Sequence, residues 1–251
     1  TSGDLAALIA VKAKNLSLPY HFLTIAELYR EAKQPDDALD WAERGVKAFS
    51  DNLDPRLLEF LADEHHRRRR HDEALALIWR LFENQPDLEG YQRLKQHAAR
   101  ADAWPHWRER ALTLLRRKAE PGVNRTRERH HLWAASRDRS TLVSVFLWEK
   151  DAEAAWSEAQ AGGCSRELWL RLAAARETEH PADAIPIHLR EAEALIAQKN
   201  NGAYEQAVRQ LQKVKSLHLS LGQSVEWSAT LARLRAAHKP KRNFIARAAR
   251  L

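Results

Sequence analysis

The sequence predicts an all-α fold in which antiparallel helix pairs stack side by side. Three observations lead to this prediction. Apolar residues recur at helical spacing, small residues recur about every 34 residues, and prolines and aspartates stand near the expected helix starts. Strand signals are nearly absent, because β-branched residues are scattered and no alternating apolar run is bounded by a hairpin turn.

Two stretches of the chain align with each other at these spacings. The aligned positions are Phe22, Ile25, Ala26, Tyr29, Ala38, Ala42 and Gly45, then Leu58, Leu61, Ala62, His65, Ala74, Ile78, Leu81 and Pro86. This spacing resembles the tetratricopeptide repeat, in which small residues let two helices approach closely. One such pair cannot bury its own apolar face, so we expect the pairs to stack into a right-handed superhelix, a solenoid.

Further repeats follow with less regular spacing. A third copy comprises Tyr91, Leu94, Ala98, Trp107, Ala111 and Leu114, a shortened fourth Leu142, Phe146, Ala155 and Trp156, and a fifth Leu168, Leu172, Ala184 and Ile187. Trp107 stands where the repeat favours alanine, so either the helices are splayed there or the ring fills a gap between pairs. Tyr204, Ala207 and Val208 resemble the opening of a second helix, so the helix over 182–199 would serve two pairs.

Helix boundaries are indicated by residues that favour helix ends. Expected starts carry a nearby proline (Pro19, Pro35, Pro55, Pro86 and Pro181) or an aspartate in the first turn or cap (Asp36, Asp72, Asp87 and Asp151). The Gly162-Gly163 pair predicts a helix stop, and Asn201-Gly202 a turn between helices.

The expected organisation has three parts in one continuous solenoid. Residues 1–118 hold the N-terminal repeats, 119–138 a basic irregular connection, and 139–251 degenerate helical repeats. No apolar run is long enough to span a bilayer, and the opening residues lack the pattern of a signal peptide. The single cysteine, Cys164, rules out an internal disulfide and fits a cytoplasmic location. The chain has no methionine, and its first segment, 5–14, predicts an amphipathic helix with a partner upstream, which indicates a piece of a longer protein.

A more specific resemblance extends over nearly the whole chain. The segments 10–49, 77–98, 146–173, 192–214 and 238–246 together resemble the C-terminal helical region of bacterial SWIM zinc-finger proteins. The resemblance implies a helical-repeat region that accompanies an N-terminal zinc module with three cysteines and a histidine. With one cysteine, this chain cannot supply such a module, so no zinc ligand is carried over.

Charge suggests a second class of partner. The net charge is +7 and the pI is near 9.7, which favours nucleic acid or acidic partners. Basic residues cluster at His65–His71, at Arg116–Arg139, and in the tail at Lys239, Lys241 and Arg242. The first cluster is interpreted as a solvated turn or as a contact for phosphate or an acidic peptide, and the second as a linker or as a contact surface for nucleic acid. Aromatic residues that could stack bases are sparse there, with Trp133 beside His130 and His131.

No motif predicts chemistry. Adjacent histidines on a helix diverge by about 100° and do not chelate one metal easily, and the sequence has no H-E-x-x-H or Cys-x-x-Cys motif. No nucleophile elbow surrounds Cys164, and no glycine-rich phosphate loop is found. We therefore expect no catalytic residue, no metal site and no cofactor. Four of the nine tryptophans (Trp41, Trp79, Trp156 and Trp169) stand beside apolar repeat positions and are predicted to be core, whereas Trp104 and Trp133 are less constrained.

The first helix of each pair lines the inner surface in tetratricopeptide stacks, which singles out candidate binding residues. They are Tyr20, Leu23, Glu27, Arg30 and Glu31 in the first repeat, then Arg56, Glu59, Asp63, His66 and Arg67 in the second. Both signs of charge occur, so we expect either a mixed-charge groove for a protein segment or neighbouring domain, or a merely solvated surface. The function predicted is a non-catalytic interaction scaffold; the alternative is a basic accessory to nucleic-acid binding.

Overall fold

The computed structural model describes residues 2–50, 54–120 and 138–251, with side-chain detail from residue 5 onward. Within these ranges every regular element is a helix and no strand occurs, so the all-α prediction is confirmed. The chain divides into two compact units, Thr1–Leu115 and Arg116–Leu251. None of the described helices combines the length and apolarity that a bilayer span requires.

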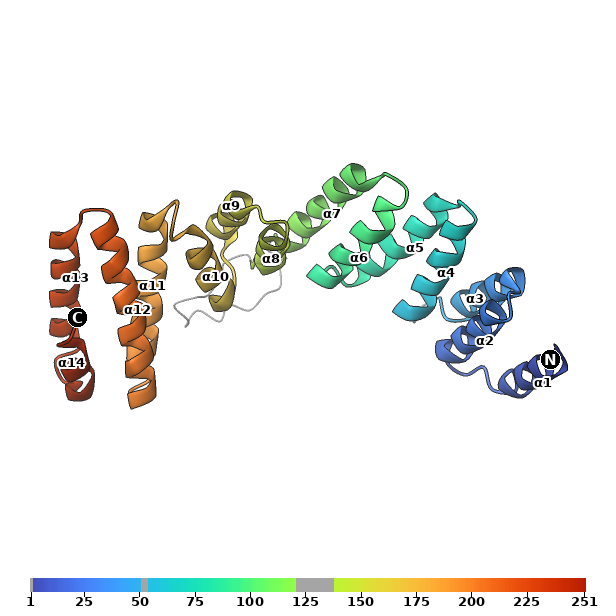
Figure 1. Ribbon diagram of the computed structural model, residues 1–251, viewed down its shortest axis with the longest axis horizontal. Helices are drawn as coiled ribbons and strands as arrows, with labels where there is room; N and C mark the ends of the chain where they lie inside the picture. Colours follow the sequence, from blue (N-terminus) through green and yellow to red (C-terminus); the bar gives the residue numbers. More distant parts are fainter. Residues whose placement is uncertain (1, 51–53, 121–137) are drawn as a thin grey trace. The chain divides into compact units, whose positions relative to one another are not determined.

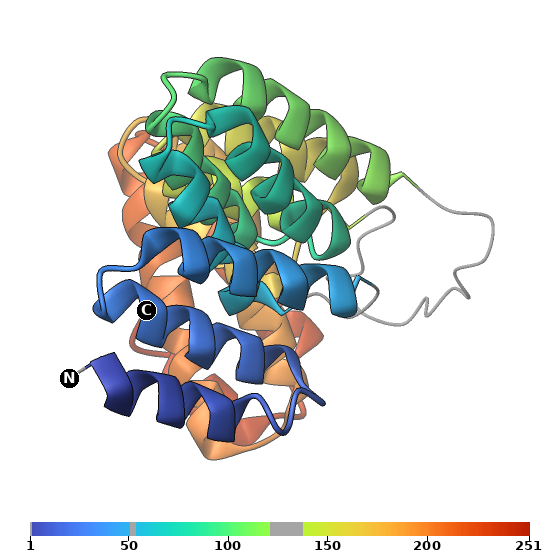
Figure 2. The ribbon, with the colours of Figure 1, turned by 90° about the vertical axis from the view of Figure 1, so that its right-hand side faces the viewer.

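Helices of the first unit follow one another through short turns (Figure 1). They are α1 (Ser2–Lys12), α2 (Pro19–Glu31), α3 (Pro35–Ala48), α4 (Pro55–Arg67), α5 (His71–Asn84), α6 (Leu88–Ala99) and α7 (Trp104–Ala119), whose last turn belongs to the second unit. From α2 to α6 each helix packs against the next, and α2 also packs against α4. In Figure 2, α2 to α5 lie side by side in chain order.

The second unit continues the pattern of helical hairpins. Its helices are α8 (Ser140–Trp148), α9 (Ala152–Gly162), α10 (Arg166–Arg176), α11 (Pro181–Ala197), α12 (Asn201–Ser220), α13 (Ser224–Ala237) and α14 (Arg242–Ala248). As expected for a helix shared by two pairs, α11 packs against both α10 and α12. The Asn201-Gly202 pair forms the first turn of α12 rather than a loop before it, because the Asn200 side chain caps the helix one residue earlier.

The small residues of the repeats lie where helices approach most closely. Ala26, Ala38 and Ala42 are fully buried in the core between α2, α3 and α4. A Cβ added to Gly45 would lie 2.6 Å from the Cβ of Phe22 and 2.9 Å from the Cδ2 of Leu57, so only glycine fits there. The aromatic ring of Trp107 packs 5.6 Å from that of Trp79, which shows that the ring fills the space between α5 and α7.

The turns within the hairpins share a backbone geometry that the sequence analysis did not predict. Lys33, Arg69, Asp102, Lys150 and Gly222 each adopt a positive φ, between 52° and 71°, two or three residues beyond the last residue of the helix. The amide that follows each of them donates to a carbonyl five residues back, as from Gln34 to Tyr29 and from Arg70 to His65. This is the Schellman ending of a helix, in which glycine normally occupies the position with positive φ.

Predicted helix ends and core tryptophans agree in part with the structure. Asp87 and Asp151 cap α6 and α9, and Gly163, with a φ of 79°, ends α9. Trp79 and Trp169 are buried, whereas Trp41 and Trp156 are half-buried. Trp104 packs edge-on against Tyr91. Trp133 and the His130-His131 pair lie outside the described residues.

Candidate functional site: the face of α2, α4 and α6

The candidate binding residues lie on two helices that pack directly against each other. Tyr20, Glu27 and Arg30 belong to α2, and Arg56, Glu59, Asp63 and Arg67 to α4. Two cation–π contacts join the helices: the Arg56 guanidinium lies 5.5 Å from the Tyr20 ring, and that of Arg30 lies 4.4 Å from the ring of Phe60. Basic side chains of α2 and α4 therefore cover aromatic rings of the neighbouring helix.

The next first helix of the series, α6, supplies partners for the acidic residues of α4. Arg93 lies 3.5 Å from a carboxylate oxygen of Glu59, and Arg100, just after α6, lies 2.5 Å from one of Asp63. Neither arginine was among the predicted binding residues, although each follows its partner by about one repeat, 34 and 37 residues on. We call the side chains that make these four contacts the cross-helix ladder; its members are Tyr20, Arg30, Arg56, Glu59, Phe60, Asp63, Arg93 and Arg100.

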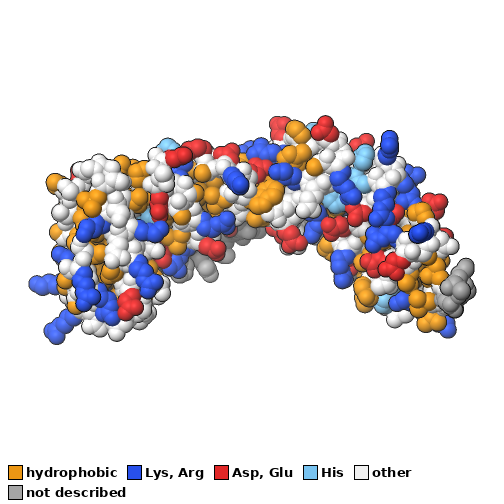
Figure 3. Space-filling model, viewed as in Figure 1, with side chains coloured by type: hydrophobic (Ala, Val, Ile, Leu, Met, Phe, Trp, Pro, Cys, Tyr) orange, Lys and Arg blue, Asp and Glu red, His pale blue; other side chains and the backbone are white. Residues whose placement is uncertain are grey.

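Three of the other candidate residues do not join the ladder. Leu23 is buried in the core of the first unit. Arg67 turns back to Glu64 on its own helix, 2.5 Å away, and Glu64 is fully buried and also binds Arg68. Glu27 is half-buried on α2. Acidic and basic side chains are nevertheless interspersed over the helices of this unit, as Figure 3 shows.

Ladder contacts are weak enough to be exchanged. The side chain of Arg56 is 66% exposed, and those of Glu59 and Asp63 are 39% and 35% exposed. Ion pairs at such exposure contribute about 0–1 kcal/mol each, since water screens the charges. A partner that offers its own charges to these groups would lose little by displacing the internal contacts.

Beneath the ladder lies a hydrogen-bonded chain of three histidines. His66 Nδ1 is 2.8 Å from His71 Nδ1, and His66 Nε2 is 3.1 Å from His97 Nδ1. Burial, together with the charge of the nearby Arg100, lowers the pKa of His66 to about 4. Burial also lowers the pKa of His97. The lowered pKa values keep the rings of His66 and His97 neutral at pH 7, where each of the two nitrogen pairs can hold one proton.

Basic clusters outside the ladder are partly tied to the protein. In the His65–His71 run, His65 and His66 are buried and Arg68 binds Glu64 and Asp36, whereas Arg67, Arg69 and Arg70 are exposed. Most of the Arg116–Arg139 cluster lies outside the described residues. Its two ends, Arg116 and Arg139, both bind Glu158 of the second unit.

In the part of the chain that the structure describes, no three or more histidine, cysteine, aspartate or glutamate side chains are arranged so that they could hold a metal ion. Cys164 is buried, and burial raises the pKa of its thiol to about 12, so it is a poor nucleophile at neutral pH. A scan against protein-family models and a search of curated proteins both gave no match to this chain.

Proposed function

We propose that this chain is a non-catalytic interaction scaffold, the helical-repeat region of a larger bacterial protein, and that the cross-helix ladder receives a protein segment. The observation that carries the proposal is the ladder itself, in which three successive first helices contribute charged side chains, and α2 the exposed ring of Tyr20, to exchangeable contacts. Stacked helical pairs use such repeated surfaces to bind extended segments of partners.

The proposal includes a tetratricopeptide-like superhelix and the kinship with SWIM zinc-finger proteins that the sequence suggests. The first rests on the repeat spacing and is supported by the regular hairpins with recurrent Schellman turns, and the second rests on the five sequence segments that resemble those proteins. The ladder carries two acidic and four basic side chains, so we expect a partner segment that bears both signs of charge. A neighbouring domain of the same polypeptide is the alternative source of that segment.

Site-specific crosslinking tests the proposal. A photoreactive amino acid replaces Tyr20 in the full chain expressed in a bacterial host, and a second version carries it at Val225, an exposed position of α13. We expect crosslinks to a discrete protein from position 20, and we expect the double variant R30E/R56E to abolish them. The matched control R233E changes an exposed arginine of α13 and should leave them intact.

Nucleic-acid binding is the competing outcome. In a mobility-shift titration with labelled duplex DNA, phosphate contacts would give an affinity that falls steeply with salt concentration, because counterions are released. Salt-sensitive DNA binding that survives R30E/R56E, together with no crosslink specific to position 20, would overturn the scaffold proposal.

A further inference from the structure

Positive charge is concentrated in the last two helices of the chain. Residues 224–251, which comprise α13, α14 and the residues that link and follow them, contain seven lysines and arginines but one acidic residue, Glu226. Because the net charge of the whole chain is +7, this short segment carries most of the excess. Lys239, Lys241 and Arg242 belong to it, and the proposed scaffold makes no use of them.

The structure brings this segment against the turn between α11 and α12, within the second unit (Figure 1). The Lys241 ammonium donates to the carbonyl oxygen of Ile196 at 3.3 Å, and the Asn243 amide donates to Asn201 at 3.1 Å. The neighbouring turn contributes Lys199 as a further cation. Lysine and arginine side chains gather over this end of the second unit in Figure 3. We define the basic edge as Lys199, Lys239, Lys241, Arg242 and Arg250.

Acidic side chains near the basic edge do not neutralise it. Glu193 lies 3.2 Å from Arg233, and Glu205 lies 3.4 Å from Arg247, so both are already paired. Glu226 stands at the start of α13, at the opposite end of that helix from the basic edge. Four exposed cations of the edge have no carboxylate partner among the described residues, namely Lys199, Lys239, Arg242 and Arg250.

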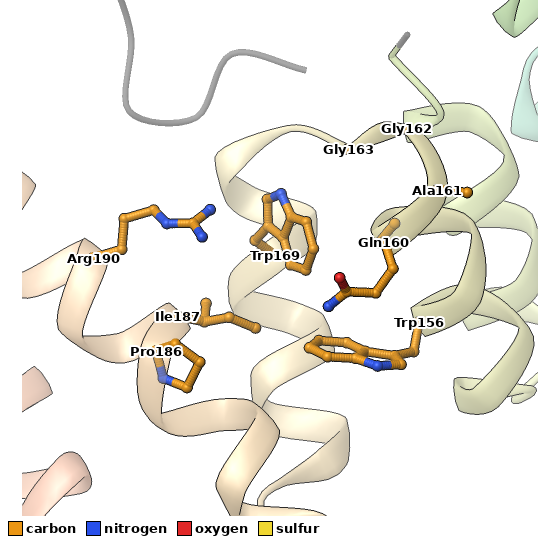
Figure 4. A pocket seen from close by; sticks show the side chains of 10 residues that line it. Trp156, Gln160, Ala161, Gly162, Gly163, Trp169, Pro186, Ile187 and Arg190 are labelled. Carbon is orange, nitrogen blue, oxygen red and sulfur yellow. The ribbon is translucent and has the colours of Figure 1, made fainter. Parts of the chain in front are cut away.

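These cations differ from the buried Arg176 of the same unit. Helices α9, α10 and α11 line a cavity of about 320 Å³, where Trp156 and Trp169 meet edge to face with ring centroids 5.8 Å apart (Figure 4). Arg176 lies 4.9 Å from the Trp156 ring, but it binds Glu153 and Asp183. Unlike Arg176, the exposed cations of the basic edge can bind an anion without giving up an internal partner.

The surface around these cations decides which anionic partner fits. Between the two arginines of the edge, α14 exposes Asn243, Ala246 and Ala249, and no large apolar side chain is exposed among residues 226–251. Protein interfaces and bilayer surfaces are normally anchored by large apolar or aromatic side chains. Because the basic edge offers none, it suits a phosphate backbone, which is bound through charge and polar donors alone.

Aromatic rings that could stack unpaired bases are buried in this segment. Trp227 is 6% exposed and Phe244 is 0% exposed. Proteins that bind single strands use exposed aromatic rings as stacking platforms, so the edge suits a duplex whose bases stay paired. The exposed amides of Asn201 and Asn243 lie beside the cations, and such amides commonly bind phosphate oxygens.

We propose that the basic edge binds the phosphate backbone of a nucleic-acid duplex without reading its base sequence. The four exposed cations contact phosphates, while Lys241 adds its charge and holds the two turns together. The site is on the second unit and does not involve the cross-helix ladder. It adds a nucleic-acid contact to the proposed scaffold, because a protein segment on the ladder and a duplex on the basic edge can bind the same chain.

Fluorescence anisotropy of the full chain with short labelled duplexes tests the proposal. Two DNA duplexes of unrelated sequence should bind equally, and an RNA duplex in parallel shows which of the two backbones is preferred. With about four phosphate contacts, the affinity should fall about 100-fold between about 50 and 200 mM salt, because counterions are released. A single strand, phosphatidylserine vesicles and polyglutamate should bind more weakly at equal concentration of negative charge.

A pair of double variants separates the basic edge from general electrostatics. K239Q/R242Q should weaken duplex binding at low salt at least about tenfold and make it less salt-dependent, because two phosphate contacts are lost. Its thermal melt should be unchanged, since neither side chain has a partner in the described structure. The matched control K150Q/R171Q removes the same charge from exposed positions of the α8–α9 turn and α10, and should bind like the unchanged chain.

Several results would overturn the proposal. It fails if K239Q/R242Q binds duplexes as tightly as the unchanged chain, or if K150Q/R171Q loses as much affinity. It also fails if the single strand, the vesicles or polyglutamate bind more tightly than the duplexes. Crosslinking from position 20 should persist in K239Q/R242Q, so failure of the basic edge and failure of the ladder are observed separately.

Discussion

Acidification should open the first unit at α4 and α6, because the buried histidine chain resists protonation. Among these histidines, His66 has the largest shift in pKa. In the folded chain its pKa is about 4, against 6.5 for an ordinary histidine. It faces His71 from α5, His97 and Arg100 from α6 and its end, and Asp63 from its own helix. Only Asp63 favours the charged ring, and it is already paired with Arg100.

The direction and the size of this change in stability follow from proton linkage. A depressed pKa in the folded state means that the unfolded chain binds more protons, so stability is complete above pH 6.5 and falls as the pH drops toward 4. At pH 5 the unfolded imidazole is almost wholly protonated while His66 is mostly neutral. Because each pKa unit corresponds to 1.36 kcal/mol, the free energy of unfolding should fall by about 2 kcal/mol between pH 7 and pH 5. The lowered pKa values of His65 and His97 act in the same direction.

Hydrogen exchange detected by mass spectrometry measures this loss in the intact chain. After correction for intrinsic exchange rates, we expect the protection of α4 and α6 to fall by about 2 kcal/mol between pH 7 and pH 5. Protection of α8, which contains no histidine, serves as the internal reference. The variant H66Q retains two hydrogen-bonding atoms without titrating, so it should lose most of the pH dependence. Equal loss in α4 and α8, or an unchanged pH dependence in H66Q, would refute the reasoning.

Three further predictions concern single substitutions. G45A should lower the free energy of unfolding by about 1–3 kcal/mol, because a Cβ there would lie 2.6 Å from the Cβ of Phe22. The control G202A, whose added Cβ would have its nearest contact at 3.6 Å, should be neutral or stabilising. Equal effects of the two substitutions in a urea melt would count against the close-packing explanation. K33G should stabilise the α2–α3 hairpin by up to about 1 kcal/mol, since glycine adopts a φ of 59° without strain; faster exchange of that hairpin would contradict this. R176L should destabilise the second unit by about 1–3 kcal/mol, because two carboxylates lose a buried donor, and an unchanged melt would disprove it.

Much of the fold follows from local sequence. Helix starts at Pro19, Pro35, Pro55 and Pro181 match the structure because proline fixes φ and lacks the N–H that the first helical turn cannot use. The burial of positions such as Ala38, Ala74 and Ala111 could be predicted for a different reason. Only small side chains fit where helices cross closely, so small residues recur along the repeats.

The turns between helices were much less predictable. Lys33, Arg69 and Asp102 occupy equivalent left-handed positions, at steps of 36 and 33 residues. Lysine and arginine do not signal that conformation, because the packing of the flanking helices imposes it and overrides the local preference for glycine. The repeat period was the one sequence signal that could have indicated these left-handed turn positions.

The sequence by itself determined that this chain is all helical, where its hairpins begin, and which face of α2 and α4 carries mixed charge, because those properties depend on periodicity along single helices. Only the tertiary structure decided which residues meet across helices. Arg93 and Arg100 complete the ladder, His66 joins His71 to His97, and Trp156 meets Trp169 edge to face. Such contacts join residues 5 to 37 positions apart through side-chain reach and packing, which no local pattern encodes.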